Sequence, residues 1–358
     1  MKSRSYLISG FILTILLGML VLFSVLPPSL EIHFFFDAIS LFAIFIPMIC
    51  FYIIVFPDVN QVSDKFLNKY KMLWIMEISI LMGVYWCFFG FTSSWHGFLS
   101  GSMEELLNQG VSTLKFLTAN LSVAFITVLY SFLIALSFFI LSFFVKGSPI
   151  DKRDKRKRYF VNIISLLMTI LVFHFTYNVA IDTKGKGFFD SVFYIYSILG
   201  YSSIPLISMF VGVLLFFVVQ RNTSLLNLFL NLVSDTDESE DQTVSQLYAI
   251  SKTKKIISGI YMIAVVSIPM MLFGTLVMYI ENSNELFMLL FSTSKVMMFC
   301  VLLTIVFSIL EAKFNYKLYR SEKRIIRDGM FLPKYMALPT ILYFLIVVFV
   351  FVLSTVLF

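Results

Sequence analysis

Long apolar segments, separated by short polar and charged ones, make up most of this chain. Nearly every apolar segment has about 20 residues or more, which is enough for an α-helix to cross the ~30 Å hydrocarbon core of a bilayer. Helices are expected because lipid offers no hydrogen-bonding partner to an exposed backbone. The pattern therefore predicts an all-α, polytopic transmembrane helix bundle of about nine spans. The predicted spans are residues 6–26, 37–56, 72–94, 117–145, 159–181, 203–219, 256–280, 287–311 and 335–358.

The composition also favours lipid as the surroundings of these helices. Hydrophobic residues account for 59% of the chain and charged residues for 13%, whereas soluble domains average about 25% charged residues. A water-soluble protein with this composition would expose large apolar patches and aggregate.

Sequence motifs for soluble enzyme chemistry are missing: there is no Gly-rich phosphate loop, H-E-x-x-H or G-x-S-x-G. Cys50, Cys87 and Cys300 lie in apolar segments without metal-ligand spacing. We therefore expect no enzymatic activity, no metal and no cofactor. The net charge of +6 comes from short runs between spans, which suits anionic lipid and not nucleic acid.

The basic residues orient the chain through the positive-inside rule. With the N-terminus in the cytoplasm, most of the 27 Lys and Arg residues fall on the cytoplasmic side, including the run at 151–158, the lysines at 252–255 and the segment from Lys313 to Lys334. About nine spans then place the C-terminus outside. We expect a multi-pass protein of the bacterial inner (cytoplasmic) membrane, in contact with the lipid bilayer.

The pattern T-x-x-x-S-x-L-x-A occurs twice, in FITVLYSFLIA (125–135) and in LLTIVFSILEA (302–312). Residues 38–55 also align without gaps on 203–220, and both matches come in the same order. These matches predict a tandem duplication, and four spans per copy would give both copies the same orientation, as in parallel repeats. The expected units are residues 1–146, a basic linker at 147–158, residues 159–312, and a last segment at 313–358 with the ninth span.

Small polar residues recur at a spacing of four in this pattern: Thr127 and Ser131 in the first copy, Thr304 and Ser308 in the second. Residues four apart share one face of a helix. Such a stripe lets helices pack closely in lipid, where hydrophobicity does not drive association. The alternative interpretation places these hydroxyls along a polar pathway for an ion.

Three ionisable residues lie well inside the limits of predicted spans, where such groups are costly and indicate function. Glu77 lies near the cytoplasmic end of the third span, where it could pair with a lysine or relay an ion. His174 lies in the outer half of the fifth span, either as a buried hydrogen-bonded group or as a proton relay. Lys295, near the outer end of the eighth span, is expected to extend outward.

Three segments of the first half carry a family resemblance: NLSVAFITVLYSFLIALSFF (120–139), FFFDAISLFAIFIPM (34–48) and MEISILMGVYWCFFGF (76–91). The first resembles the last membrane helix of the MotA/TolQ/ExbB proton-channel family. The other two resemble the start of the second helix in its flagellar MotA branch and the third helix of the family. The order of two spans, a cytoplasmic loop and two spans is also similar.

The resemblance implies a function in which a ring of subunits surrounds single-span partners, and a partner carboxylate carries protons across the membrane. It implies that Thr127 and Ser131 face a partner helix, supplied by a single-span protein or by further copies. The loop from Pro57 to Tyr70 is too short for the rotor-contacting domain of flagellar members. We therefore expect a proton-channel or energy-coupling subunit. The alternatives are a transporter or permease with a site between the repeats, and a non-conducting membrane scaffold.

Overall fold

The computed structural model confirms the all-α class. It describes residues 37–56, 65–99, 113–145, 158–180, 204–221, 230, 240–277, 283–322 and 340–346, which are helical throughout except at Asp37, Phe56 and Val145. The first predicted span and most of the ninth lie outside the described residues. The principal helices are α2 (Ala38–Val55), α3 (Lys65–Leu99), α5 (Thr113–Phe144), α6 (Arg158–Ala180), α8 (Ile204–Arg221), α10 (Glu240–Val277) and α11 (Ser283–Glu322).

Five described helices are long and apolar enough to cross a membrane, and they coincide with the second, third, fourth, fifth and eighth predicted spans. The chain is therefore an integral membrane protein. The predicted spans at 203–219 and 256–280 fall on α8 and α10, which are helical as expected, and their crossing of the bilayer stays a prediction. The five candidate spans are Ala38–Val55, Phe66–His96, Ala124–Phe144, Tyr159–Tyr177 and Met288–Tyr319.

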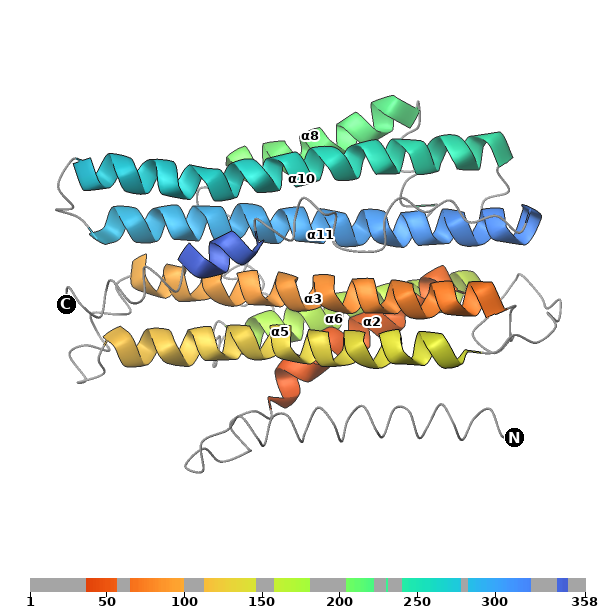
Figure 1. Ribbon diagram of the computed structural model, residues 1–358, viewed down its shortest axis with the longest axis horizontal. Coiled ribbons are helices and arrows are strands. Elements are labelled where there is room, and N and C mark those ends of the chain that lie inside the picture. Colours follow the sequence, from red (N-terminus) through yellow and green to blue (C-terminus); the bar gives the residue numbers. More distant parts are fainter. Residues whose placement is uncertain are drawn as a thin grey trace.

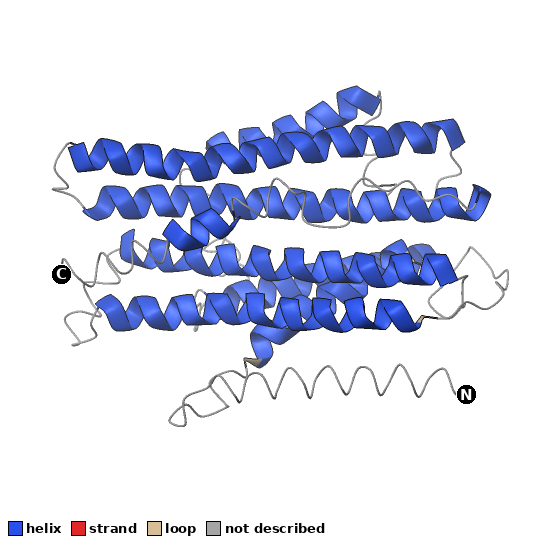
Figure 2. Ribbon diagram, viewed as in Figure 1, coloured by secondary structure: helices blue, strands red, loops and turns tan. Residues whose placement is uncertain are grey.

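Helix α3 forms the centre of the bundle and packs against α5, α11 and α2. Figures 1 and 2 show α10, α11, α3 and α5 side by side with nearly parallel axes, and α8 beside α10. Most of the α3 span is buried, which fits its apolar character on all sides. Helix α6 packs mainly against α2 and exposes most of its span, including Phe160 and Leu171. Its exposed apolar face suits contact with lipid chains.

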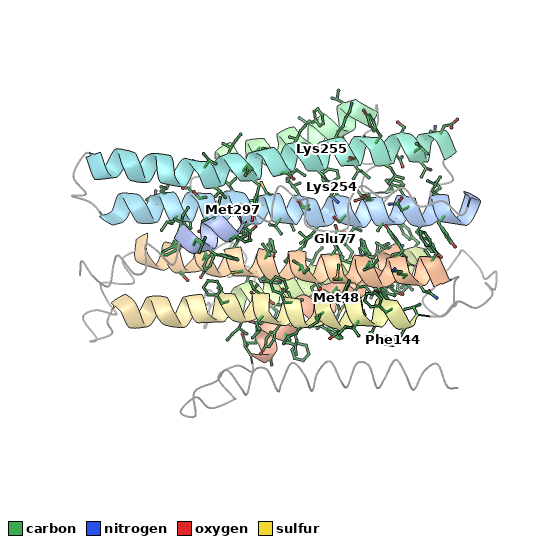
Figure 3. All side chains as sticks on the ribbon, viewed as in Figure 1. Met48, Glu77, Phe144, Lys254, Lys255 and Met297 are labelled. Atoms are coloured by element: carbon green, nitrogen blue, oxygen red, sulfur yellow. The ribbon has the colours of Figure 1, made fainter. Side chains whose placement is uncertain are left out.

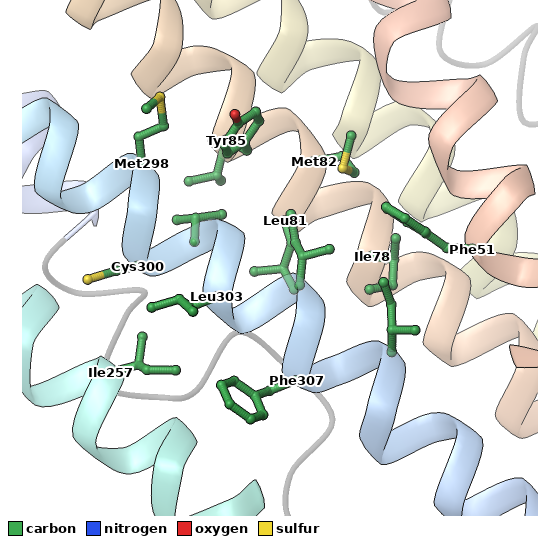
Figure 4. Close-up of a cluster of buried hydrophobic side chains, with 14 of the residues drawn as sticks. Phe51, Ile78, Leu81, Met82, Tyr85, Ile257, Met298, Cys300, Leu303 and Phe307 are labelled. Atoms are coloured by element: carbon green, nitrogen blue, oxygen red, sulfur yellow. The ribbon is translucent and has the colours of Figure 1, made fainter. Parts of the chain in front are cut away.

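The hydrophobic core extends between α3 and α11, with contributions from α2 and α10 (Figure 4). Ile78 and Leu81 on α3 are directed to α11, whereas Leu303 and Phe307 lie on the side of α11 that is turned to Ile257 of α10, and all these side chains are buried. The core therefore continues from α10 through α11 to α3, and α3 packs directly against α11. This contact joins the first predicted half of the chain to the second.

Polar contacts hold α2 against α3 and α5. Asp37 caps the start of α2, where its side chain accepts a hydrogen bond from the backbone N–H of Ile39 at 3.1 Å. The backbone N–H of Asp37 donates to the Tyr130 hydroxyl of α5 at 2.8 Å. The indole Nε1 of Trp86 in α3 donates to the carbonyl oxygen of Ala43 at 3.0 Å. These hydrogen bonds fix the position of α2 along the bundle axis relative to α3 and α5.

Two glycines allow α3 and α5 to approach closely. A Cβ atom added to Gly83 would overlap the side chain of Ser131, and one added to Gly90 would lie 2.8 Å from the Cβ of Ala124. Close backbone approach over small residues is the usual way in which membrane helices associate, since lipid supplies no hydrophobic drive.

The helix directions agree with what the predicted duplication requires. In Figure 1, α3 and α10 run in the same direction, and α5 and α11 run in the opposite one. The helices α2, α3 and α5 contact one another, as do α8, α10 and α11. The duplication itself stays a prediction.

Helices α3, α10 and α11 are longer than a membrane crossing, with 35, 38 and 40 residues. At 1.5 Å per residue they are roughly 50–60 Å long, against ~30 Å of hydrocarbon. They therefore extend beyond the hydrocarbon core. In the orientation predicted from the basic residues, the start of α3, the start of α10 and the end of α11 lie at the cytoplasmic end.

Candidate functional site

Three helices meet at a cluster of charged side chains, which we call the ionic cluster: Glu77 from α3, Lys254 from α10, and Ser308 and Glu311 from α11. The ammonium Nζ of Lys254 lies 2.8 Å from Oε2 of Glu311 and 3.8 Å from Oε1 of Glu77. Figure 3 shows Lys254 between α10 and α11, and Glu77 between α11 and α3. One ammonium group therefore holds two carboxylates that come from different helices.

Ser308 connects the two sides of the ionic cluster. Its Oγ donates a hydrogen bond to Oε1 of Glu77 at 3.2 Å and accepts one from Nζ of Lys254 at 3.2 Å. The carbonyl oxygen of Ser308 accepts a further bond from the indole Nε1 of Trp74 at 3.2 Å. The serine hydroxyl therefore forms a short bridge between an ammonium group and a carboxylate.

The ionic cluster is largely shielded from solvent. The side chains of Glu77, Lys254 and Glu311 are 8%, 13% and 18% exposed. Charges taken out of water at this depth must be paired, because each unpaired ion would cost several kcal/mol. The close contact between the carboxylates and the ammonium supplies that pairing.

Helical spacing explains how each helix contributes to this contact. Trp74 and Glu77 are three residues apart on α3, and Ser308 and Glu311 are three apart on α11, so each pair shares a face. Lys254 lies on the face of α10 that is directed to α11, together with the buried residue Ser258.

The first small-residue stripe lies against α3 of the same chain. The hydroxyl of Thr127 donates to the carbonyl oxygen of Ala124 at 2.6 Å and lies 3.3 Å from the carbonyl oxygen of Gly83. The hydroxyl of Ser131 donates to the carbonyl oxygen of Val128 at 2.7 Å. Both residues are buried, and this contact supports the packing interpretation of the stripe.

The second stripe divides between packing and the ionic cluster. Ser308 belongs to the ionic cluster, whereas the hydroxyl of Thr304 donates to the carbonyl oxygen of Cys300 at 2.8 Å, within its own helix. The central helix α3 therefore lies between Ser131 on one side and Ser308 on the other. His174 is half-buried on α6, and the contacts described for Glu77 are all to α10 and α11.

Lys295 was expected to extend outward and instead lies buried within the bundle. The residue is 1% exposed, and its ammonium lies 4.6 Å from the centre of the Phe291 ring, one turn nearer the predicted outer end of α11. The imidazole of His96 from α3 lies 5.9 Å from the same ring, between ring centres.

Sequence reasoning identified Glu77 and Ser308 but missed Lys254, Glu311 and Trp74. Lys254 belongs to a basic segment at 252–255 that was assigned to the cytoplasmic side as a topology signal. The sequence did contain one indication of a lysine at this position: a carboxylate such as Glu77 in an apolar span requires a cationic partner. Which lysine fills that need depends on the packing of α10 against α11.

Among the residues that the structure describes, no three His, Cys, Asp or Glu side chains are placed to hold a metal ion. Cys50, Cys87 and Cys300 are buried free thiols. No protein-family model, no curated protein and no solved structure matches this chain. The ionic cluster and the membrane-spanning helices are therefore the features on which a function can be argued.

Proposed function

We propose that this protein moves protons as a polytopic membrane transporter, with the ionic cluster as the proton-binding site between its two halves. The observation that carries the proposal is the contact of Glu77 with both Lys254 and Ser308, which joins α3 to α10 and α11. Ionisable groups within membrane spans are expensive and are retained where they serve an ion pathway.

The geometry offers a route for the proton. Lys254 donates to the oxygen of Ser308, and Ser308 donates to Glu77. If the ammonium group gives a proton to the hydroxyl oxygen while the hydroxyl proton moves to the carboxylate, Lys254 and Glu77 both become neutral and the serine is restored. Neutralising both partners removes the attraction that holds them together, so proton transfer would loosen the contact.

Loosening this contact would allow relative movement of the halves. The ionic cluster lies where α3 of the first half meets α10 and α11 of the second. Packed helix interfaces switch between discrete arrangements when the charges that hold them change. A substrate pathway between the halves would in this way respond to the protonation of Glu77.

The energy-coupling role implied by the family resemblance also involves proton movement, but it requires a partner helix beside Thr127 and Ser131. Those residues pack against Gly83 of their own chain. The placement favours the transporter interpretation, with the ionic cluster as the proton site in place of the stripe on α5.

Proton flux into liposomes tests the proposal. The purified chain is reconstituted with a pH-sensitive dye inside, and a pH gradient is imposed. Glu77→Gln should lower the flux by roughly 10²-fold, the scale expected when a positioned proton-transfer group is lost. The matched control is Asp241→Asn, which removes an exposed carboxylate from the cytoplasmic end of α10 and should leave the flux unchanged.

Infrared difference spectra provide a second measurement that needs no transported substrate. The carbonyl band of protonated carboxyl groups that appears after a change in pH should contain one component, present in the parent chain and in Asp241→Asn, that is missing in Glu77→Gln. Equal proton flux in the parent chain and Glu77→Gln, or no flux through the parent chain, would refute the role in proton movement.

A further inference from the structure

The outward surface of α10 carries one continuous stripe of exposed residues that changes from cationic to apolar along the helix. Apart from the adjacent pair Lys255 and Ile256, the residues follow one another at spacings of three and four, so they lie on one side of the helix. We call this face the outer α10 stripe. Its members are Tyr248, Lys252, Lys255, Ile256, Gly259, Ile263 and Val266.

The cationic end of the stripe is directed away from the ionic cluster. Successive residues of an α-helix are turned by about 100°, so Lys255 does not share the face on which Lys254 reaches α11, and both Lys252 and Lys255 are exposed (Figure 3). The ammonium group of Lys252 lies 4.6 Å from the ring centre of Tyr248, which is 64% exposed. Two cationic groups and an amphipathic ring therefore lie together at one level of the helix.

The apolar end of the stripe begins one residue later. Ile256 and Val266 are exposed, and Ile263 is 72% exposed. Between them, a Cβ added to Gly259 would meet no atom within 4 Å, so the glycine leaves a shallow space on the helix surface. An apolar surface of this kind is unfavourable in water and suits a hydrocarbon chain.

The contact with α11 places this apolar end beside a candidate membrane span. Lys254 pairs with Glu311 at 2.8 Å, and from there α10 runs antiparallel to α11, alongside the apolar span Met288–Tyr319. Lys252 and Lys255 thus lie near the boundary between the charged residues of the ionic cluster and the apolar residues that follow on both helices. Asp241, an exposed acidic residue of the same helix, is ~16 Å away from Lys252 along the axis.

We propose that the outer α10 stripe is a binding site for one anionic phospholipid. The phosphate of the lipid contacts Lys252 and Lys255, and one acyl chain lies along Ile256, Gly259 and Ile263. Charge complementarity selects an anionic headgroup, and the apolar part of the stripe selects a lipid over a soluble phosphate. This site does not depend on the proton pathway, since Lys254 alone of the three lysines faces the ionic cluster.

Native mass spectrometry of the full chain in neutral detergent tests the site. Phosphatidylglycerol and phosphatidylcholine with identical acyl chains are titrated separately, and bound lipid is counted. Phosphatidylglycerol should bind more tightly, and Lys252→Gln or Lys255→Gln should each weaken it roughly fivefold. Lys69→Gln, which removes an exposed cation from α3, is the matched control and should keep the affinity of the parent chain.

Two further measurements separate the headgroup from the acyl chain. Gly259→Leu, which fills the space on the stripe, should weaken phosphatidylglycerol binding although it changes no charge. Binding to the parent chain should fall as salt is raised, because the contact is electrostatic and solvent-exposed.

Three results would overturn the proposal: equal affinity for the two lipids, an equal loss in Lys69→Gln, or displacement of phosphatidylglycerol by millimolar inorganic phosphate. The salt series needs no variant, so the test holds even if a lysine substitution impairs folding.

Discussion

Replacing Gly83 with alanine should destabilise the protein by forcing α3 away from α5. The new Cβ would overlap the side chain of Ser131 and lie 3.0 Å from the carbonyl oxygen of Thr127. A serine hydroxyl can rotate, but its Cβ and a backbone carbonyl cannot yield without moving α5. The substitution therefore strains the contact between two membrane helices.

Two opposing terms set the size of this effect. Overpacking of a close contact costs typically ~1–3 kcal/mol, whereas Gly→Ala inside a helix gains about 0.5–1 kcal/mol. For Gly83→Ala we expect a net loss of about 1–2 kcal/mol. Gly90→Ala should lose less, because its Cβ would press mainly on the Cβ of Ala124 at 2.8 Å.

Two other helical glycines provide the matched controls. A Cβ on Gly212 or Gly259 would meet no atom within 4 Å, so alanine there should only gain the helix term of about 0.5–1 kcal/mol. Because all four substitutions share that term, the difference between Gly83→Ala and Gly212→Ala isolates the overpacking cost.

The free energy of unfolding in detergent micelles, followed by loss of helical circular dichroism during a denaturant titration, measures these differences. The double variant Gly83→Ala/Ser131→Gly should recover stability, because it removes the obstructing Cβ on α5. If Gly83→Ala proves as stable as Gly212→Ala, α3 and α5 do not approach each other as described, and the reasoning fails.

Three further substitutions test other contacts. Lys254→Gln leaves Glu77 and Glu311 without their shared cation and should cost about 3–5 kcal/mol; a thermal unfolding midpoint equal to that of the parent chain would argue against a buried ion pair. Tyr343→Phe should change the free energy of unfolding by no more than ~1 kcal/mol in a denaturant titration, because the buried Tyr343 hydroxyl lies near the side chains of Trp95 and Ser294 without well-aligned hydrogen-bond geometry. A larger loss of stability would show that this hydroxyl makes a strong hydrogen bond to one of them. Trp86→Phe removes a 3.0 Å hydrogen bond to α2 and should cost ~1 kcal/mol or more, measured in the same titration; no change would show that this bond does not hold α2.

Hydropathy along the chain located several helices well. The segments 37–56 and 159–181 correspond to Ala38–Val55 and Arg158–Ala180. The segment 256–280 instead belongs to a longer helix, which begins at Glu240 and is described as far as Val277. Hydropathy reports where a helix enters lipid, and it does not report how far the same helix continues through polar residues in water.

The face that each polar residue presents could not be predicted in the same way. Lys295 was expected to extend outward from its span and is buried within the bundle beside Phe291. A stretch that is apolar on nearly all sides gives no sign of which side faces lipid and which faces protein. The packing of α11 against α3 decides that question.

The sequence by itself determined that this is a membrane protein built from helices, because the cost of exposing backbone amides to lipid depends only on local composition. It also singled out Glu77, because a carboxylate in an apolar span is costly wherever its partner lies. Only the tertiary structure decided that the partner is Lys254, that Ser308 bridges the pair and that the first small-residue stripe lies against α3. The contacts of Glu77 join residues about 180 to 230 positions apart, and Thr127 meets Gly83 across 44 positions, so all of them depend on how the helices align in space.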